Sequence, residues 1–397
     1  MKKELALFLA NSGGVYPARP SLVYPLPPET STLFLAECNG AAPREIVLAD
    51  AAGATVLSYS QEKLDVLAQP RFVSLLPSGS KEPLFLKETA LDLDADGIEE
   101  WLLPMPSGYS LRTMDKEIAL LPCDVISEIR RIESTYITHR LPAYQAFALE
   151  GKKGVAFLSD EFADFTYGTD WSQHERFRIP RNLEEKWEAA SKMEDINCDG
   201  FPDLLVTQTK GTINLQVMTQ IYVATTPFKY PGQPTATYTN KGGIASPALE
   251  DIDGDGKLDL ILVHLPFGVK TIINYFVRGK LAVDAHVYLY RDGFKQQPDY
   301  TTTLTLDAPE GRERVAYTLG DFSGDGRKDV AFGTGVEALV VQRGEPEKFV
   351  ESKPWLTLNV PSFGTARPHD LNGNPAQDIV LFHPSGDNSK RIEVIVF

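Results

Sequence analysis

Residues 249–263 read LEDIDGDGKLDLILV, a short loop of acidic residues and glycines between two apolar runs. The same pattern occurs at four other places in the chain, as LDLDADGIEEWLL (91–103), EDINCDGFPDLLV (194–206), GDFSGDGRKDVAFG (320–333) and HDLNGNPAQDIVLF (369–382). Repetition of one pattern is typical of proteins built from copies of a single supersecondary unit. The run after each loop is rich in Val, Leu and Ile, which favours a β-strand.

Two further segments are degenerate copies of this pattern. Residues 36–49, AECNGAAPREIVLA, have Ala41 at the fifth loop position, and residues 148–159, ALEGKKGVAFLS, keep the apolar flanks around a much shorter turn. The seven copies begin their loops at Glu37, Asp92, Glu150, Asp195, Asp251, Asp321 and Asp370. Each interval has room for about four strands of roughly 5 to 6 residues. We therefore predict an all-β fold and a single domain over residues 1–397, a seven-bladed β-propeller with four-stranded antiparallel blades.

The two ends of the chain suggest how such a propeller would close. Only two strand-like runs, residues 378–382 and 392–397, follow the last loop, so the last blade is one strand short. The apolar run at residues 4–10 is one strand more than the first blade needs. We predict that this N-terminal strand joins the C-terminal blade, which would leave no open sheet edge. The same run could instead belong to a signal peptide, although Glu4 interrupts it.

Side chains with oxygen atoms occupy positions 1, 3, 5 and 9 of the five well-preserved loops. Ca²⁺ binds about six to eight oxygens, and a backbone carbonyl at position 7 would supply one of them. The predicted ligands are Asp92, Asp94, Asp96, Ile98, Glu100; Asp195, Asn197, Asp199, Phe201, Asp203; Asp251, Asp253, Asp255, Lys257, Asp259; Asp321, Ser323, Asp325, Arg327, Asp329; and Asp370, Asn372, Asn374, Ala376, Asp378. We expect about four or five calcium ions per chain, held most tightly by the Asp92 and Asp251 loops, which have the most carboxylates.

The loops have two other interpretations. EF-hand loops begin in the same way but need a Glu at position 12 and flanking helices. Position 12 here is apolar in every copy: Leu103, Val206, Leu262, Phe332 and Leu381. The loops could also be turns without an ion, since Asp, Asn and Gly are common in turns. Clustered carboxylates repel one another unless a cation neutralises them, and this favours metal sites.

Charge and composition argue against several functional classes. The chain has 39 Lys and Arg against 54 Asp and Glu, a net charge of −15, so it lacks the basic surface of a general nucleic-acid binder. No apolar run reaches the roughly 18 to 20 residues of a transmembrane helix. Cys38, Cys123 and Cys198 are too few for a disulfide framework. The six dispersed histidines belong to no catalytic motif, and we identify no catalytic residue.

The five loops resemble the FG-GAP and VCBS repeats of the integrin α-subunit propeller and of many bacterial envelope and secreted proteins. The resemblance extends from about residue 4 to the end of the chain, and is weak at the two degenerate copies. It implies calcium ions that stabilise the blades structurally and, more loosely, a role in adhesion or ligand binding. The Phe-Gly and Gly-Ala-Pro signatures of integrins are poorly preserved.

Two segments interrupt the repeat and could carry a partner surface. Residues 162–192 contain several aromatic residues and a possible short helix over 183–192. Residues 264–300 contain Phe267, Tyr275, Phe276 and Tyr288. Both segments could instead form ordinary blade strands, with their aromatic residues packed on the propeller.

The sequence therefore favours a non-catalytic, calcium-binding propeller that binds or assembles with a protein or glycan. Many calcium modules work near 10⁻⁴ to 10⁻³ M, so we expect it at the cell surface, outside the cell or in the periplasm. The alternative is a propeller enzyme, a polysaccharide lyase or hydrolase with its site in the central channel.

Overall fold

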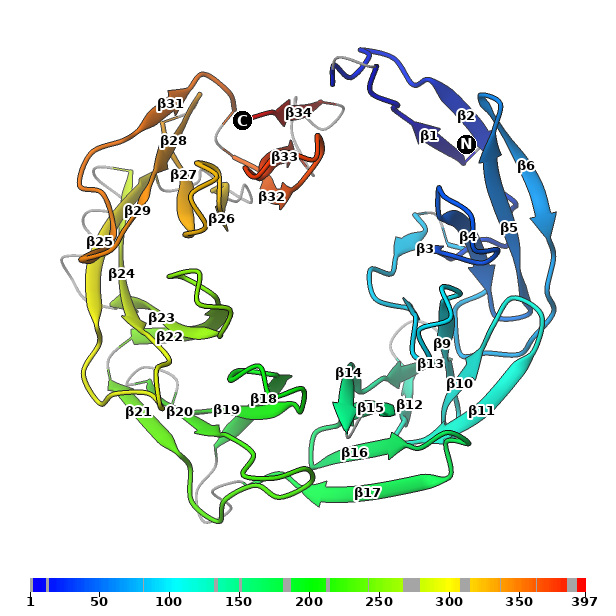
Figure 1. The fold of residues 1–397 in the computed structure, drawn as a ribbon, viewed down its shortest axis with the longest axis horizontal. Coiled ribbons are helices and arrows are strands. Elements are labelled where there is room, and N and C mark those ends of the chain that lie inside the picture. Colours follow the sequence, from blue (N-terminus) through cyan, green and yellow to red (C-terminus); the bar gives the residue numbers. More distant parts are fainter. Residues whose placement is uncertain are drawn as a thin grey trace. The chain divides into compact units, whose positions relative to one another are not determined.

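The computed structural model describes residues 3–397 apart from 12–13, 81, 132–134, 150–151, 181–186, 212–214, 242, 267–278, 308–314, 336, 362 and 384–390. The described residues form β-strands and no helix (Figure 1). The chain divides into two compact units, one of residues 1–180 with 200–202 and one of residues 181–199 with 203–397. No helix among the described residues is long and apolar enough to cross a membrane.

The first unit contains three of the seven blades. Their strands are β3 (Thr32–Ala36), β4 (Glu45–Asp50), β5 (Gly53–Ser60), β6 (Lys63–Ala68) and β7 (Leu84–Phe85); β8 (Ala90–Leu91), β9 (Glu100–Met105), β10 (Gly108–Arg112) and β11 (Glu117–Pro122); and β14 (Ala143–Leu149), β15 (Lys152–Leu158), β16 (Phe162–Tyr167) and β17 (Gln173–Arg178). Successive strands pair antiparallel, except that β7 pairs parallel with β3 as a fifth strand. Two hairpins accompany the blades: β1 (Glu4–Leu7) with β2 (Leu22–Pro25), and β12 (Ile126–Arg131) with β13 (Thr135–Arg140).

The second unit contains the other four blades. Their strands are β18 (Glu188–Glu194), β19 (Asp203–Lys210), β20 (Gln216–Tyr222) and β21 (Ala236–Lys241); β22 (Gly243–Glu250), β23 (Asp259–Pro266), β24 (Lys280–Tyr288) and β25 (Tyr300–Asp307); β26 (Tyr317–Gly320), β27 (Asp329–Gly335), β28 (Ala338–Gln342) and β31 (Leu356–Leu358); and β32 (Thr365–His369), β33 (Asp378–Phe382) and β34 (Ile392–Ile395). A small hairpin of β29 (Gly344–Glu345) and β30 (Lys348–Val350) interrupts the third of these blades. Within this unit the first strand of each blade lies on the inner side and the later strands lie further out (Figure 1).

The hydrophobic core lies between neighbouring blades rather than within one sheet. Leu205 and Ile221 of one blade, for example, belong to the same buried cluster as Leu260 and Tyr288 of the next. Middle strands such as β9, with burial along almost its whole length, need apolar residues on both faces. A single blade could not bury both faces alone, so neighbouring blades depend on each other for stability.

The predicted all-β chain of seven propeller blades is confirmed, and so is the shortage of one strand in the last sheet, which has three strands among the described residues. Within the first unit, β1 pairs with β2 over the register Glu4↔Pro25 to Leu7↔Leu22, a pairing that the sequence pattern did not predict. Leu5 and Leu7 pack on the Ile46, Leu48 and Leu57 cluster of the first blade. A partner only a short loop away costs less chain entropy than one at the other end of the sequence.

The two segments predicted to project from the repeat consist largely of blade strands where they are described. Residues 162–192 include β16, β17 and the start of β18. The helix predicted over 183–192 is wrong in its described part, because β18 pairs with β19 along its whole length and tertiary context overrides helix propensity. In the range 264–300, Tyr288 is buried in β24, whereas Phe267, Tyr275 and Phe276 lie outside the described residues.

Candidate metal sites

Each predicted metal loop joins the first strand of a blade to the second. The loops beginning at Asp92, Asp195, Asp251, Asp321 and Asp370 follow β8, β18, β22, β26 and β32 and end where β9, β19, β23, β27 and β33 begin. The ninth loop residue is therefore also the first residue of a buried strand. The sequence expectation that a strand, and not a helix, follows the ninth residue is met in all five loops.

The ninth-position carboxylate is buried in all five loops and in the degenerate first one, and it holds the loop closed. Glu100 is 3% exposed, and the other members are 0% exposed: Glu45, Asp203, Asp259, Asp329 and Asp378. In every case one carboxylate oxygen accepts a hydrogen bond of 2.8 to 3.0 Å from the backbone N–H of loop position 2. The loop therefore closes on this side chain before any ion is considered.

The aspartates at this position use their second oxygen as well. Asp203, Asp259, Asp329 and Asp378 each accept a hydrogen bond of 2.8 to 2.9 Å from a backbone N–H two residues past the end of the third strand. The donors are Ala224, Tyr290, Gly344 and Phe397. One carboxylate thus joins the start of the loop to the segment that follows the third strand. The longer Glu100 makes only the first of these two contacts among the described residues.

The first-position aspartate shapes the turn. In the loop that begins at Asp251, Oδ1 accepts from the N–H of Gly254 at 2.9 Å and Oδ2 from the N–H of Gly256 at 3.0 Å. Both glycines have positive φ, +79° and +87°, which a residue with a side chain adopts only at a cost. This geometry turns the backbone so that the third-position side chain comes back toward the first.

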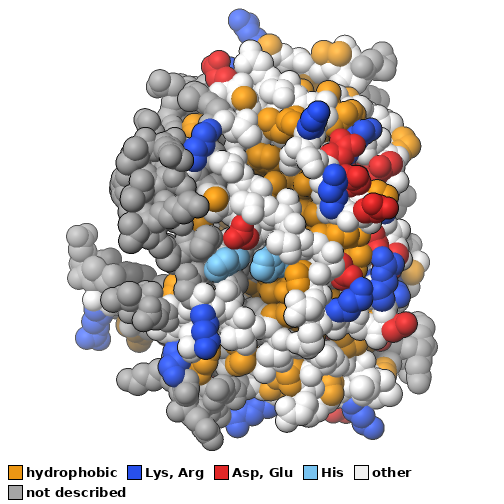
Figure 2. All heavy atoms as spheres, turned by 90° about the vertical axis from the view of Figure 1, so that its left-hand side faces the viewer, with side chains coloured by type: hydrophobic (Ala, Val, Ile, Leu, Met, Phe, Trp, Pro, Cys, Tyr) orange, Lys and Arg blue, Asp and Glu red, His pale blue; other side chains and the backbone are white. Residues whose placement is uncertain are grey.

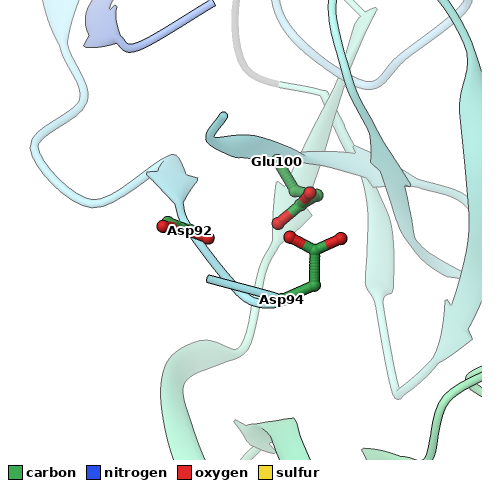
Figure 3. Close-up of side chains that lie close together, drawn as sticks. All are labelled: Asp92, Asp94 and Glu100. Atoms are coloured by element: carbon green, nitrogen blue, oxygen red, sulfur yellow. The ribbon is translucent and has the colours of Figure 1, made fainter. Parts of the chain in front are cut away.

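Two loops bring three carboxylates together closely enough to hold a metal ion. The groups are Asp92, Asp94 and Glu100, and Asp251, Asp253 and Asp259, and in each the candidate ligand oxygens lie within 4.8 Å of one another. Figure 3 shows the carboxylates of Asp94 and Glu100 facing each other, with Asp92 beside them at the end of the preceding strand. Both groups come from the loops that the sequence ranks as the tightest sites, and their chemistry suits a hard cation.

The other predicted ligands lie in the same loops but outside these two clusters of described residues. Fifth-position Asp96 and Asp255 accept hydrogen bonds from the backbone two residues later, at 2.7 and 2.9 Å. The remaining three loops have Asn197, Ser323 and Asn372 at position 3, so they offer an amide or hydroxyl oxygen in place of a third close carboxylate.

Burial changes the acidity of the ninth-position carboxylates. Loss of contact with water raises the pKa of Asp203 to about 7 and of Asp259 to about 6, although hydrogen bonds from backbone N–H groups oppose the shift. Neighbouring loop carboxylates raise these two pKa values further, and burial also raises the pKa of Glu100. A nearby divalent cation would favour the ionised form of the same groups.

In the degenerate first loop, polar groups of the loop hydrogen-bond to one another. Asn39 Nδ2 donates to Glu45 Oε1 at 2.5 Å, and Glu37 Oε1 accepts from the N–H groups of Asn39, Gly40 and Ala41. The amide of Asn39 thus occupies the place where a cation would contact Glu45. In the other degenerate copy, β14 and β15 pair up to Leu149↔Lys152, and the shorter turn predicted between them lies at residues 150–151, outside the described residues.

Two basic side chains that the sequence did not single out lie beside the candidate metal sites. Arg291 Nη2 is 2.8 Å from Asp253 Oδ2, and Lys153 Nζ donates to the backbone oxygen of Asp92 at 2.5 Å. They come from segments remote in sequence, and no local pattern marks them. Arg291 partly neutralises the acidic cluster and would compete with a bound cation for Asp253.

Neighbouring loops within each unit are joined by backbone hydrogen bonds. In the first unit Glu99 N–H donates to Glu37 O at 2.8 Å. In the second unit the same contact links three pairs of loops: Leu258 N–H to Ile196 O, Lys328 N–H to Ile252 O and Gln377 N–H to Asp321 O. In every pair position 8 of one loop donates to position 1 or 2 of the loop before it. The loops of the second unit therefore form a continuous row.

Residues 195–262 match the family model of the FG-GAP-like repeat. The chain carries an FG-GAP-like repeat. The match runs from the Asp195 loop through β19 to β22 and the Asp251 loop into β23, so this FG-GAP-like repeat spans one complete inter-loop interval of the second unit. No curated protein matches the chain. The FG-GAP-like repeat includes one of the two three-carboxylate clusters, at Asp251, Asp253 and Asp259.

Proposed function

We propose that the chain is a non-catalytic propeller module that binds calcium at its blade loops and a protein or glycan partner elsewhere, at the cell surface, outside the cell or in the periplasm. The observation that carries the calcium proposal is the pair of three-carboxylate clusters, one of which lies within the segment that matches the FG-GAP-like repeat. Three carboxylates in one small space repel one another, and a divalent cation with oxygen preference removes that repulsion.

The loops support a structural role for the ion. They join the first two strands of a blade, and the ninth ligand already ties the loop to the end of the third strand. An ion bound to positions 1, 3 and 9 would add one more connection between the same segments. Because the ligands come from one blade, calcium would stabilise the folded blade rather than take part in a reaction.

The proposed location follows from the expected affinity. Loops of this kind with three or four carboxylates are comparable with extracellular calcium modules, whose dissociation constants are about 10⁻⁴ to 10⁻³ M. Such concentrations of free calcium occur outside the cytosol, which is why we place the module at the envelope or beyond it.

The direct test is a thermal melt of the full chain in millimolar calcium and in excess chelator, with bound metal counted by elemental analysis. We expect about four or five ions per chain, and a stabilisation of about 2.7 kcal/mol for each site at a free calcium concentration 100 times its Kd. Identical melts together with no bound metal would refute the calcium proposal.

A matched pair of variants assigns the ions to loops. Asp251→Asn changes the first position of a three-carboxylate cluster and should remove one ion and part of the calcium-dependent stabilisation. Glu37→Gln makes the same kind of change in the loop closed by Asn39, and should leave the number of bound ions unchanged. Equal loss of metal in both variants would contradict the assignment.

A further inference from the structure

The second unit contains a cavity of about 550 Å³ between two neighbouring blades. One wall comes from β20 and β21 and the other from β23 and β24, and residues 296–298 close one end. Its volume is in the range of pockets that enclose small organic ligands. It lies apart from the metal loops, at the place where the buried core between these blades gives way to polar side chains.

The wall residues belong to facing surfaces of the two sheets. Val217 and Thr219 of β20 lie opposite Asn240 and Tyr238 of β21, so all four side chains share one face. On the other wall Leu262 of β23 lies opposite His286 of β24, and His264 is on the same face two residues further along β23. The cavity is thus built from regular strands, whose positions the blade packing fixes.

The described lining of the cavity contains no Asp, Glu, Lys or Arg. This is unusual in a chain with 23% charged residues. Its polar groups are hydroxyls, amides and imidazoles, and nearly all of these can both donate and accept hydrogen bonds. Figure 2 shows two histidine side chains next to each other, with one acidic side chain directly above them, while most other acidic side chains gather along its right-hand edge.

Several of these groups are held in place while others have no partner in the described part of the chain. Tyr238 Oη donates to Lys295 O at 2.7 Å and so anchors the segment that closes the cavity. The amide of Asn240 hydrogen-bonds to Nδ1 of His264, which fixes that ring. Neither ring nitrogen of His286 and no amide group of Gln297 is hydrogen-bonded within the described residues. These groups are free to receive a ligand.

Aromatic surface accompanies the polar groups. The rings of Tyr238 and Tyr288, one from each wall, lie 4.2 Å apart between centroids and form part of the floor. A ligand that suits this combination carries many hydroxyls that donate and accept hydrogen bonds, has apolar C–H surface to place against aromatic rings, and has no net charge. Neutral carbohydrates have all three properties.

We propose that the cavity between β20–β21 and β23–β24 is a binding site for a neutral sugar unit of a glycan. This deepens the proposed binding role and rests on it. Asn240, His264, His286 and Gln297 hydrogen-bond the sugar hydroxyls, and the two tyrosines contact its C–H face. No carboxylate is among the described lining residues, so these residues alone do not form the two-acid arrangement of glycosidases.

The test uses the calcium-loaded full chain on an array of neutral oligosaccharides of hexoses and N-acetylhexosamines, with sialylated and sulfated forms of the same sugars as the charged set. The tightest neutral sugar is then titrated by calorimetry. We expect a preference for the neutral set, at least tenfold weaker binding for His286→Ala and about threefold to tenfold weaker binding for Gln297→Ala. Gln297 is exposed, so its variant tests the site without risk to the fold.

His139→Ala serves as the matched control, because His139 is exposed on the β12–β13 hairpin of the other unit. It should bind the sugar as the parent protein does. The proposal is overturned by binding of charged sugars alone, by neutral binding that both cavity variants leave unchanged, or by no sugar binding from a folded chain. A peptide or Zn²⁺ that binds in a His286-dependent way while no sugar does would also overturn it.

Repeating the titration in chelator separates the two proposals. Sugar binding without any effect of calcium on the melt would keep the cavity and refute the calcium sites. Calcium-dependent stability without sugar binding would keep the calcium sites and refute the sugar site in the cavity.

Discussion

Asp259 shows how one residue can have two roles in a loop. It is the ninth-position member of a three-carboxylate cluster, and its two oxygens also accept hydrogen bonds from the N–H groups of Ile252 and Tyr290. Its side chain is completely buried. Conservation of carboxylates at this position would therefore be expected from closure of the blade alone, and it does not by itself indicate an ion.

Two aspartates of this loop should therefore differ in how much stability the chain loses when each is replaced by asparagine. Asp259→Asn places an amide NH₂ group against a buried N–H donor, so it should destabilise the chain by about 1 to 3 kcal/mol even in chelator. Asp255→Asn keeps the oxygen that accepts from Lys257 N–H, and should change stability little in chelator. Chemical denaturation of both variants with and without calcium checks this. Equal stability of the two variants in chelator would show that Asp259 acts only through a metal.

At the scale of elements, the loops of neighbouring blades lie against one another. Gly254 and Gly256 of one loop both have positive φ, but their surroundings differ. A Cβ on Gly254 would overlap the carbonyl oxygen of Gly326 in the next loop, whereas a Cβ on Gly256 would meet no atom within 4 Å. The first glycine is needed for the approach of two blades, and the second only for the turn.

Alanine substitutions at Gly254 and Gly256 separate the effect of the close approach of two loops from the effect of backbone strain in the turn. Gly256→Ala should cost about 1 to 2 kcal/mol, the strain of a left-handed backbone. Gly254→Ala should cost clearly more and should also weaken calcium binding at the adjoining Asp321 loop, because the two loops must move apart. Thermal melts and calcium titrations of the pair measure both effects. Similar losses for both variants would mean that the loop contact is not tight.

At the scale of the whole molecule, the net charge of −15 opposes compaction when no cation is bound. Five divalent ions would contribute ten positive charges and leave a net charge of −5. Screening of charges by salt should therefore increase the stability of the metal-free chain more than that of the calcium-loaded chain.

Raising NaCl from about 10 mM to about 1 M shortens the screening length from roughly 30 Å to 3 Å. We expect the melting temperature in chelator to rise by several degrees more than that in calcium over this range. Sucrose, which stabilises proteins without screening charge, is the control and should act equally on both samples. A smaller response in chelator than in calcium would argue against self-repulsion between the acidic loops.

Local patterns in the sequence predicted most of the fold. The recurring loop and the β-prone run after it gave the number of blades, the strand that follows each loop, and the two loops richest in carboxylate, which form the three-carboxylate clusters. These features depend on spacing within some fifteen residues, where turn chemistry and strand alternation act directly.

Only the tertiary structure decided the partner of β1, the strand at 188–194 and the neutral cavity between two blades. Each depends on which surfaces meet. Leu5 and Leu7 pack against the first blade, and β19 pairs with the backbone of a segment that has helix-forming residues. Asn240 and His286 line one cavity although they are 46 positions apart in the sequence. Sequence alone determined the repeated unit because its signals are local, whereas contacts between units are long-range and were fixed only by packing.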